Sequence, residues 1–438
     1  MRVAENPSCA GCPLYGDGSQ PYTPDQHKQG ATVEVRFETT SSSRAGLPKL
    51  ERDYYKLAGL TSAQVSISHA VRCGVTLPAP VSPAQWEAGK RGDLERGVAY
   101  CERVHSRVHG GDGLGRQPSR RLLVALGDLA LQSATGQRSA HEWRGWLLPY
   151  QSKSDSWLND IWTPGQGETS TLAMVPLEDL HGLPTLGYAM QSDWKKVGKV
   201  LRGEWPQPFP GYETRPPAQW PRLSAFDTEF DPQGRLERYS LYDGRTLYVV
   251  EASSVRTLEL PGEVTVVMHN VEADIAHLQS FLHGGSVKTE DTMLMHSVLW
   301  SDLPHSLEYL GSLYARTNRW KHLFRRSPRN YAGGDALGTW DVYLSLVHDM
   351  QADSQSAWVY RHAVFPLTST IMEAEIAGLR VDQDRVQTAL AYHTALQDEA
   401  EQEAQAYSGY PMNLGSPDQI GRWLYEVERV GAKKRSRR

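Results

Sequence analysis

Three pairs of polar side chains in the second half of the chain have the types and spacing that suit metal-assisted hydrolysis. Asp227 and Glu229 are two residues apart in residues 222–229, which are predicted to form a strand, so both carboxylates leave the same face of a sheet. Asp274 comes after the next β-branched segment, four residues beyond Asn270, which can cap a helix that begins there. This spacing places Asp274 one helical turn further on, over the same face.

The third pair, Tyr331 and Asp335, is again four residues apart, in residues 331–343, which are predicted to be helical. Four acids from three separate elements are thereby accompanied by a tyrosine. Carboxylate oxygens in this number suit Mg²⁺ or Mn²⁺, and two such ions ~4 Å apart can clamp an in-line phosphodiester displacement. The tyrosine hydroxyl is suited to positioning the attacking water and to helping to deprotonate it.

The four cysteines of the chain form a second candidate site. Cys9 and Cys12 are close together near the start, Cys73 follows a strand-like stretch, and Cys101 lies in a helix-like one. Four cysteines are too few for a disulfide scaffold, so we expect reduced thiols or metal ligands. Four thiolates can bind Zn²⁺ or an iron–sulfur cluster, and the spacing does not choose between them.

The elements that must position these residues belong to a chain of globular composition. Of its 438 residues 39% are hydrophobic and 22% charged, which excludes a mainly disordered or collagen-like protein. No apolar run approaches the ~18 residues of a membrane span, and the N-terminus lacks the apolar core of a signal peptide. We therefore expect no membrane partner and a reducing, cytoplasmic location. The net charge of −5 requires a local basic patch or metal ions to hold a polyanion.

A proline-rich segment marks the clearest boundary. Residues 205–221 contain six prolines and are predicted to form an extended linker rather than a packed element. They separate residues 1–204 from residues 222–350, where strands alternate with helices and predict an α/β domain. Residues 351–438 are almost wholly helical in pattern, and Asp382 is a candidate N-cap for a long helix.

The acidic motifs resemble those of a known family. Asp227-Thr228-Glu229, Asn270-x-x-x-Asp274 and Tyr331-x-x-x-Asp335, in this order, resemble the three motifs of the DEDDy 3′–5′ exonucleases, which have a ribonuclease H-like fold. The resemblance covers residues 222–350 and extends to Asp291-Thr292-Met293, Ser306-Leu307-Glu308-Tyr309-Leu310 and Trp320-Lys321-His322. It implies that Asp227, Glu229, Asp274 and Asp335 are metal ligands and that Tyr331 positions water. Gly333 and Gly334 each cost a helix ~1 kcal/mol relative to Ala and predict a locally loose helix.

The helical region after this domain resembles the segments that join the proofreading domain of phage-type family A DNA polymerases to the thumb. The matching residues are Met372, Glu373, Gly378, Leu379 and Asp382, then Asn413, Ser416, Pro417, Gln419 and Ile420. A generic helical hairpin is the alternative. No later strand offers the paired aspartates of a polymerase, so we expect palm and fingers to come from another chain or to have been removed by truncation. The basic residues 433–438 suit either a phosphate contact or a solvated terminus.

The N-terminal region resembles the iron–sulfur uracil-DNA glycosylases. The resemblance spans residues 7–203 and is carried by residues 7–14, 69–73, Cys101, 122–130, Arg144-Gly145 and 190–203. It implies an α/β/α fold and a structural [4Fe–4S] cluster on Cys9, Cys12, Cys73 and Cys101, with zinc as the alternative.

The family's uracil-binding motifs are not intact. Residues 35–50 read VRFETTSSSRAGLPKL where a Gly-Glu-Ala-Pro-Gly-type loop is expected, and residues 176–184 read PLEDLHGLP where His-Pro-Ser is expected. His181 is a candidate remnant of that second motif. We interpret the domain as a degenerate glycosylase fold retained to bind DNA or to dock on a polymerase.

The resemblances together imply an α/β protein with four parts: a glycosylase-like domain, a linker, an exonuclease domain and the beginning of a thumb. Its expected activity is proofreading hydrolysis of DNA 3′ ends with two Mg²⁺ or Mn²⁺ during replication, in a bacterial or phage-infected cell. The expected partners are a single-stranded 3′ end or primer-template DNA and a chain that supplies palm and fingers. Uracil excision by the N-terminal domain and a non-catalytic DNA-docking module are the alternatives.

Overall fold

The computed structural model describes residues 26, 28, 31–71, 122–150, 155–165, 168–181, 183–252, 260–261, 263–278 and 287–428. The described residues up to Met372 belong to one compact unit, and those from Glu373 onward to a second. The strands are β1 (Val33–Thr39), β2 (Val65–Val71), β3 (Leu122–Leu126), β4 (Leu147–Pro149), β5 (Ser170–Met174), β6 (Tyr212–Glu213), β7 (Leu223–Phe230), β8 (Leu236–Tyr242), β9 (Leu247–Glu251), β10 (Thr265–Met268) and β11 (Lys288–Asp291). The α-helices are α1 (Thr40–Lys49), α4 (Asp128–Thr135), α5 (Ala140–Trp143), α6 (Pro184–Leu201), α7 (Val271–Leu278), α8 (Thr292–Leu299), α9 (Leu307–Tyr314), α10 (Pro328–Ala352), α11 (Ser354–Val359), α12 (Phe365–Ala377), α13 (Gln383–Ser408) and α14 (Pro417–Arg422). The fold is of the α/β class, as predicted.

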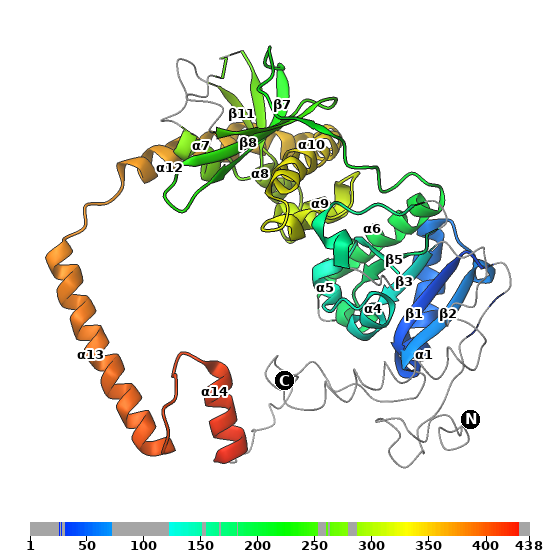
Figure 1. Ribbon diagram of the computed structural model, residues 1–438, viewed down its shortest axis with the longest axis horizontal. Coiled ribbons are helices and arrows are strands. Elements are labelled where there is room, and N and C mark those ends of the chain that lie inside the picture. Colours follow the sequence, from blue (N-terminus) through cyan, green and yellow to red (C-terminus); the bar gives the residue numbers. More distant parts are fainter. Residues whose placement is uncertain are drawn as a thin grey trace. The chain divides into compact units, whose positions relative to one another are not determined.

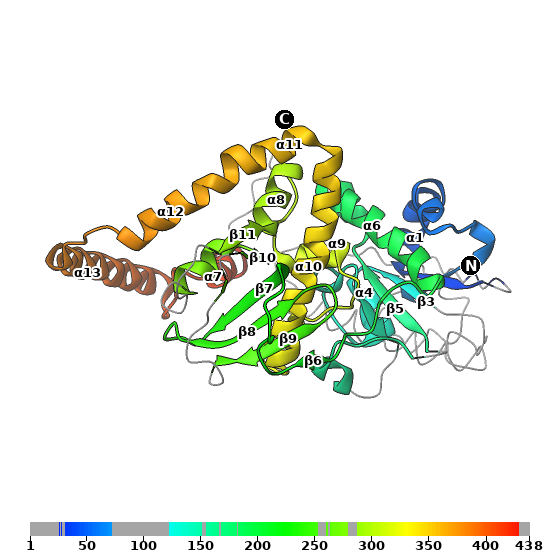
Figure 2. The same cartoon turned by 90° about the horizontal axis from the view of Figure 1, so that it is seen from above.

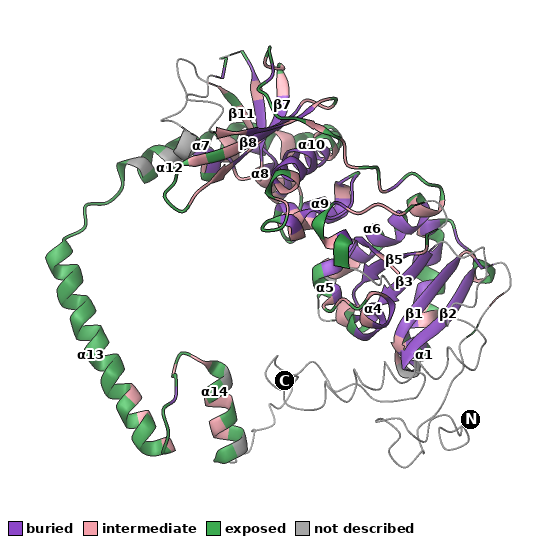
Figure 3. Cartoon of the chain, in the orientation of Figure 1, coloured by how far each residue is buried: buried purple, intermediate pink, exposed green. Residues whose placement is uncertain are grey.

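The first part of the large unit is built on a five-stranded sheet in the order β2-β1-β3-β5-β4 (Figure 1). All pairings are parallel except that of β4 with β5. Every residue of β2, β3 and β5 is buried (Figure 3), as expected for strands covered on both faces. Helices α1, α4 and α6 pack against this sheet. We refer to residues 31–201 as the five-stranded half.

The second part is built on a six-stranded sheet in the order β11-β10-β7-β8-β9-β6. Strand β7 lies at its centre, parallel to β10 and antiparallel to β8. The long helix α10 packs against β7, β8 and β9 (Figure 2). The Ser240 hydroxyl of β8 donates to the Ala332 carbonyl of α10 at 2.8 Å, which fixes the helix on the sheet.

The proline-rich segment is extended, but it packs on the large unit at two places. Trp205 is buried, and its Nε1 donates to the Ala315 carbonyl at 2.9 Å. Further along, β6 adds to the sheet by pairing in parallel with β9. The expectation of an unpacked segment is therefore wrong at these places, because burial of a large aromatic ring and strand pairing outweigh the local preference set by proline.

The second unit is helical in its described residues. Helix α13 begins after Asp382, whose carboxylate accepts the Arg385 amide at 3.1 Å, which confirms the predicted N-cap. None of its 26 residues is buried, so Figure 3 shows it exposed throughout most of its length. In α14, Ser416 accepts the Gln419 amide in the same way. No helix of the described ranges has the length and apolar character needed to cross a bilayer.

Candidate active site

The first acidic pair lies on the central strand of the six-stranded sheet. Asp227 and Glu229 are both on β7, where their cross-strand neighbours on β8 are Ser240 and Arg238. The alternation of the strand directs both carboxylates to the same face, as the spacing predicts. The register of β7 with β8 shifts directly after Glu229, so the regular ladder ends where the acids do.

The second acidic motif is held by a residue of the neighbouring strand. Helix α7 begins at Val271, directly after Asn270, and carries Asp274 in its first turn. Asp291, at the end of β11, accepts the amides of Asn270 and Val271 at 3.2 and 2.8 Å. Asp274 is 8% exposed and accepts a hydrogen bond from the Thr228 hydroxyl, which lies between the two acids of β7.

The third motif lies on α10. Asp335 is buried there, one helical turn after the half-buried Tyr331. The carboxylates of Asp227, Glu229 and Asp335 each offer an oxygen within 4.8 Å of the others. Asp274 lies outside this group of three. The structure therefore brings the predicted residues to one place, three of them as a potential metal-binding set.

Burial and mutual repulsion disfavour negative charge in this cluster. Burial raises the pKa of Asp227 well above its usual value, and the charges of Asp335, Asp274 and Glu229 add to the effect. Burial and then Asp335 raise the pKa of Glu229 to about 7. Burial likewise raises the pKa of Asp274 to about 6, against the hydrogen bond from Thr228.

One atom of the cluster tests whether a metal ion fits it. Asp227 Oδ2 is buried and has no hydrogen-bond partner in the described part of the chain. A buried carboxylate oxygen without a donor is costly, and a divalent cation would satisfy it and screen the neighbouring acids. Three hard oxygen donors within 4.8 Å suit Mg²⁺ or Mn²⁺, so the residues present fit such an ion.

A lysine and a tryptophan, neither of which was predicted as a site residue from the sequence, contact Asp335 of α10. Lys321 Nζ lies 2.5 Å from Asp335 Oδ1 and donates to the Tyr331 hydroxyl at 3.2 Å. Trp320 Nε1 donates to the same Oδ1 at 2.7 Å. Burial opposes the ammonium form, but the charge of Asp335, its direct contact with the ammonium and the charge of Asp227 outweigh burial and raise the pKa of Lys321. The Trp320-Lys321-His322 segment was the signal available in the sequence.

The glycines of the third motif do not loosen α10, which continues from Pro328 to Ala352 without a break. A Cβ on Gly333 would lie 3.1 Å from a methyl carbon of Leu247, and a Cβ on Gly334 would lie 2.4 Å from the ring of Trp320. The predicted looseness is therefore wrong. The glycines are needed because neighbouring side chains approach the helix backbone directly, and that packing offsets their low helix propensity.

The candidate residues of the N-terminal region are only partly described. Cys9, Cys12, Cys73 and Cys101 lie outside the described residues. His181 ends a 3₁₀ turn, Leu177–His181, after β5 and is exposed.

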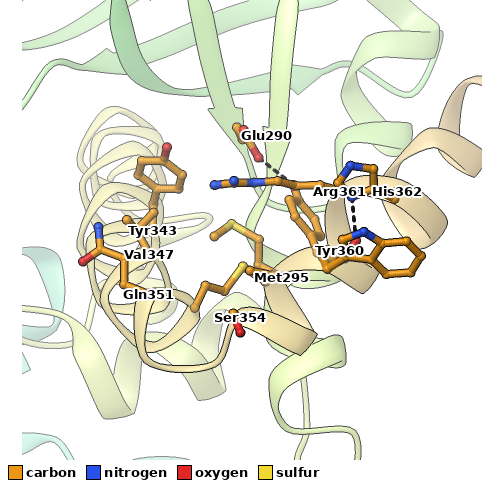
Figure 4. A pocket seen from close by; sticks show the side chains of 12 residues that line it. Glu290, Met295, Tyr343, Val347, Gln351, Ser354, Tyr360, Arg361 and His362 are labelled. Carbon is orange, nitrogen blue, oxygen red and sulfur yellow. Dashed lines mark hydrogen bonds between the residues drawn. The ribbon is translucent and has the colours of Figure 1, made fainter.

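The large unit also has a cavity of about 350 Å³ that the four acids do not line (Figure 4). It lies beside α10 and the 354–362 segment. Met295 and Val347 are among its apolar lining residues, and Tyr343, Gln351 and Arg361 also line it. The cavity offers no cluster of metal-binding groups, so the acidic cluster remains the candidate active site.

Comparison with known proteins gives a partial likeness of fold. No protein family and no curated protein matches the sequence. Among solved structures, NrnC from Brucella melitensis with bound Mg²⁺ is similar at 16% identity and a TM-score of 0.31, over 36% of this chain and 86% of that one. RNase D from Escherichia coli, an exoribonuclease involved in structured RNA processing, is similar at 17% identity and a TM-score of 0.28, over 35% of this chain and 45% of that one. The catalytic core of RRP6 from Trypanosoma brucei is similar at 19% identity and a TM-score of 0.28, over 32% and 45%. Because these likenesses are low and partial, the function proposed below rests on the acidic cluster.

Proposed function

We propose that residues 222–350 are a metal-dependent 3′–5′ exonuclease that hydrolyses DNA from its 3′ end. The observation that carries the proposal is the set of three carboxylates within 4.8 Å, one of them with a buried oxygen that lacks a donor among the described residues. Asp227, Glu229 and Asp335 would hold Mg²⁺ or Mn²⁺, and Asp274 would supply a fourth carboxylate beside them. Bound ions of this kind stabilise the charge that develops on the attacking and leaving oxygens of a phosphodiester.

Tyr331 would orient the attacking water rather than act as an ionised base. Burial and the charge of Asp335 raise the pKa of its phenol to about 12, so it stays protonated at neutral pH. Because Lys321 donates to the phenol oxygen, the O–H hydrogen of Tyr331 remains available to a water or to the substrate.

Groups suited to a single strand lie next to this tyrosine. Phe324 is 56% exposed and packs edge-on against the Tyr331 ring, with centroids 5.2 Å apart. Arg325 and Arg326 follow it and are exposed. We infer that the phenyl ring stacks on a base and that the two guanidinium groups contact phosphates. A frayed, mismatched 3′ end would reach such a site more easily than a paired one.

The wider context remains a proposal from the sequence resemblances. The six-stranded part would be the proofreading domain of a family A DNA polymerase, followed by the beginning of a thumb, with palm and fingers on another chain. Residues 1–204 would be a degenerate glycosylase-like domain whose four cysteines bind a [4Fe–4S] cluster. Brown protein with absorbance near ~400 nm after anaerobic purification would support the cluster over zinc, and colourless protein would remove it.

The test is digestion of 5′-labelled single-stranded DNA, with and without an internal uracil, in Mg²⁺ or in EDTA. Wild type should give a ladder that shortens from the 3′ end only with metal, and Asp227→Ala should give none. The same assay on RNA of equal sequence decides the preference for the sugar. Alkali-labile cleavage at uracil in EDTA, without a ladder in metal, would instead make the N-terminal domain a working glycosylase. The absence of both would favour a docking module.

A further inference from the structure

The segment that precedes α10 connects the five-stranded half to the acidic cluster. We call residues 317–323 the bridging segment; Thr317, Asn318 and Arg319 are each at most 5% exposed. The side chain of Asn318 pairs with the edge strand β4 at both of its polar atoms. Its Oδ1 accepts the Leu147 amide at 3.1 Å, and its Nδ2 donates to the Leu147 carbonyl at 2.8 Å. The segment is thus attached to the five-stranded sheet at its beginning.

Two further side chains of the bridging segment are held by aromatic residues of the same half. The Arg319 guanidinium lies 4.2 Å from the ring centroid of Trp143 and pairs with Glu142 at 3.3 Å. The His322 ring packs against Trp143 and Trp157, with centroids 5.7 and 6.3 Å apart. Arg319 also pairs with Glu308 of α9 at 2.5 Å, so the residues on either side of Trp320 and Lys321 are fixed by the five-stranded half together with α9.

Trp320 contacts both the five-stranded half and the acidic cluster. Its ring is fully buried, and Trp146 of the five-stranded half packs against it edge to face, with centroids 5.8 Å apart and planes 78° apart. Its Nε1 donates to Asp335 Oδ1, the atom that Lys321 also contacts. Both contacts are made to the same oxygen, so they fix the carboxylate from one side.

Three glycines provide the space that the indole ring of Trp320 occupies. Gly334 and Gly338 are one turn apart on α10 and flank Asp335, and a Cβ on either would lie 2.4 Å from atoms of the Trp320 ring. A Cβ on Gly311 of α9 would lie 2.6 Å from the same ring. The ring therefore rests directly on the helix backbone on both sides of the aspartate, and any larger residue would displace it.

We propose that Trp320 is a positioning residue for Asp335 and that the five-stranded half sets its position through Trp146 and the bridging segment. This inference rests on the proposed function only in naming the acidic cluster as a metal site. The five-stranded half then serves the nuclease directly, whether or not it binds DNA or excises uracil. Loss of its packing should weaken metal binding at the acidic cluster of the six-stranded part.

The test compares two tryptophan substitutions in the full chain. Trp320→Phe keeps an aromatic ring and removes the donor to Asp335. Trp194→Phe is its matched control, because Trp194 is also fully buried but its Nε1 has no partner in the described part of the chain. Both variants should lose stability because the ring becomes smaller, and Trp320→Phe should lose more because it also loses a hydrogen bond. Only Trp320→Phe should weaken Mn²⁺ binding, followed by electron paramagnetic resonance, by about 10- to 100-fold, with kcat lowered and KM for DNA little changed.

A second pair of variants tests the contribution of the five-stranded half. Trp146→Leu removes the contact with Trp320 from a residue that touches none of the four acids, and it should weaken Mn²⁺ binding several-fold. Gly338→Ala should do the same from α10, whereas Gly187→Ala on α6, where a Cβ meets nothing within 4 Å, should leave binding unchanged.

The outcomes separate this inference from the proposed function. Equal Mn²⁺ affinity for Trp320→Phe and Trp194→Phe would overturn the role of Trp320. Weakened binding in Trp320→Phe with wild-type binding in Trp146→Leu would overturn the role of the five-stranded half. Wild type that binds Mn²⁺ but cleaves no nucleic acid would refute the exonuclease and leave the positioning role measurable. Wild type that binds no Mn²⁺ would overturn both.

Discussion

Two clusters of buried charge in the large unit are built in opposite ways. At the candidate active site, four carboxylates lie near the Lys321 ammonium, and Asp227 Oδ2 has no donor within the described residues. In the other cluster, which joins the two sheets, Arg144 donates to both oxygens of Asp193, at 2.9 and 3.1 Å. Lys196 completes this joining cluster by donating to the Gly145 and Ser312 carbonyls at 2.8 and 2.7 Å.

The difference separates a cluster that holds the fold together from one that is prepared for a ligand. In the joining cluster each buried charge is matched by an opposite charge or by carbonyl oxygens, so nothing is left for a ligand to satisfy. Burial still raises the pKa of Asp193 and lowers that of Lys196 to about 7. In the acidic cluster, burial and the neighbouring carboxylates raise the pKa values of Asp227, Glu229 and Asp274, and the excess of negative charge can be relieved only by protons or by cations.

Removal of one acid should therefore affect activity and stability in opposite directions. Asp227→Asn should lower the rate of 3′ hydrolysis on the order of 10³-fold, because a metal ligand is lost. In EDTA the same variant should unfold at a higher urea concentration than wild type, because a buried, repelled carboxylate has become neutral. Glu237→Gln, with a half-exposed side chain on β8, is the control and should change neither quantity. Loss of stability in Asp227→Asn would show that the cluster is not strained by its own charge.

In the joining cluster, removal of an acid should destabilise the protein. Asp193→Ala leaves Arg144 and Lys196 without their carboxylate, and breaking a buried pair of this kind costs about 3–5 kcal/mol of unfolding free energy. Urea unfolding followed by tryptophan fluorescence measures it. The exposed ion pair Arg202–Glu204 provides the comparison, and Glu204→Ala should leave the midpoint unchanged. A small effect of Asp193→Ala would mean that the apolar contacts alone hold the two sheets together.

The acidic residues could be predicted from the sequence because their arrangement is local. The i, i+2 spacing in Asp227–Glu229 and the i, i+4 spacing in Tyr331–Asp335 fix relative orientation once strand and helix are assigned, and β7 and α10 confirm both assignments. The strand that precedes Asp274, β10, was likewise predicted from its β-branched residues. Spacing within each motif does not show that the three elements meet in space. That expectation came from the order of the motifs along the chain.

The supports of the site could not be predicted, because they depend on contacts distant in sequence. Trp146 and Trp320 meet across 174 positions, and the glycines beside Asp335 make sense only when the indole is placed on them. From the sequence Gly333 and Gly334 indicated a loose helix, whereas in the structure both allow side chains to pack closely against the helix backbone. Similarly, the prolines of residues 205–221 gave no sign that Trp205 is buried between them and the fold.

Removal of the tyrosine hydroxyl should lower the catalytic rate without changing metal affinity or stability. Tyr331→Phe should lower kcat about 10²-fold, since the group that orients water is lost, with little change in KM for DNA. Mn²⁺ affinity and stability should stay near wild type, because no carboxylate is altered. Tyr343→Phe, on the same helix but lining the cavity of Figure 4, is the matched control. Full activity in Tyr331→Phe would remove the tyrosine from the mechanism.

The smallest effect concerns pH, and its sign follows from the raised pKa values. Glu229 and Asp274 have pKa values of about 7 and about 6 in the folded protein, which are above those of an unfolded chain. Between the unfolded and the folded pKa values, the native state therefore binds more protons than the unfolded state. The metal-free protein should therefore be most stable below about pH 4.5 with respect to these groups, and it should lose this contribution as pH rises through 7. Because Glu229 is partly exposed, we expect a loss of about 1 kcal/mol, measured by urea unfolding in EDTA at pH 5 and pH 8. Saturating Mg²⁺ should cancel the loss at pH 8, and Glu229→Gln should flatten the profile in EDTA. A profile that rises with pH would mean that the acids are compensated without metal, as they are in the joining cluster.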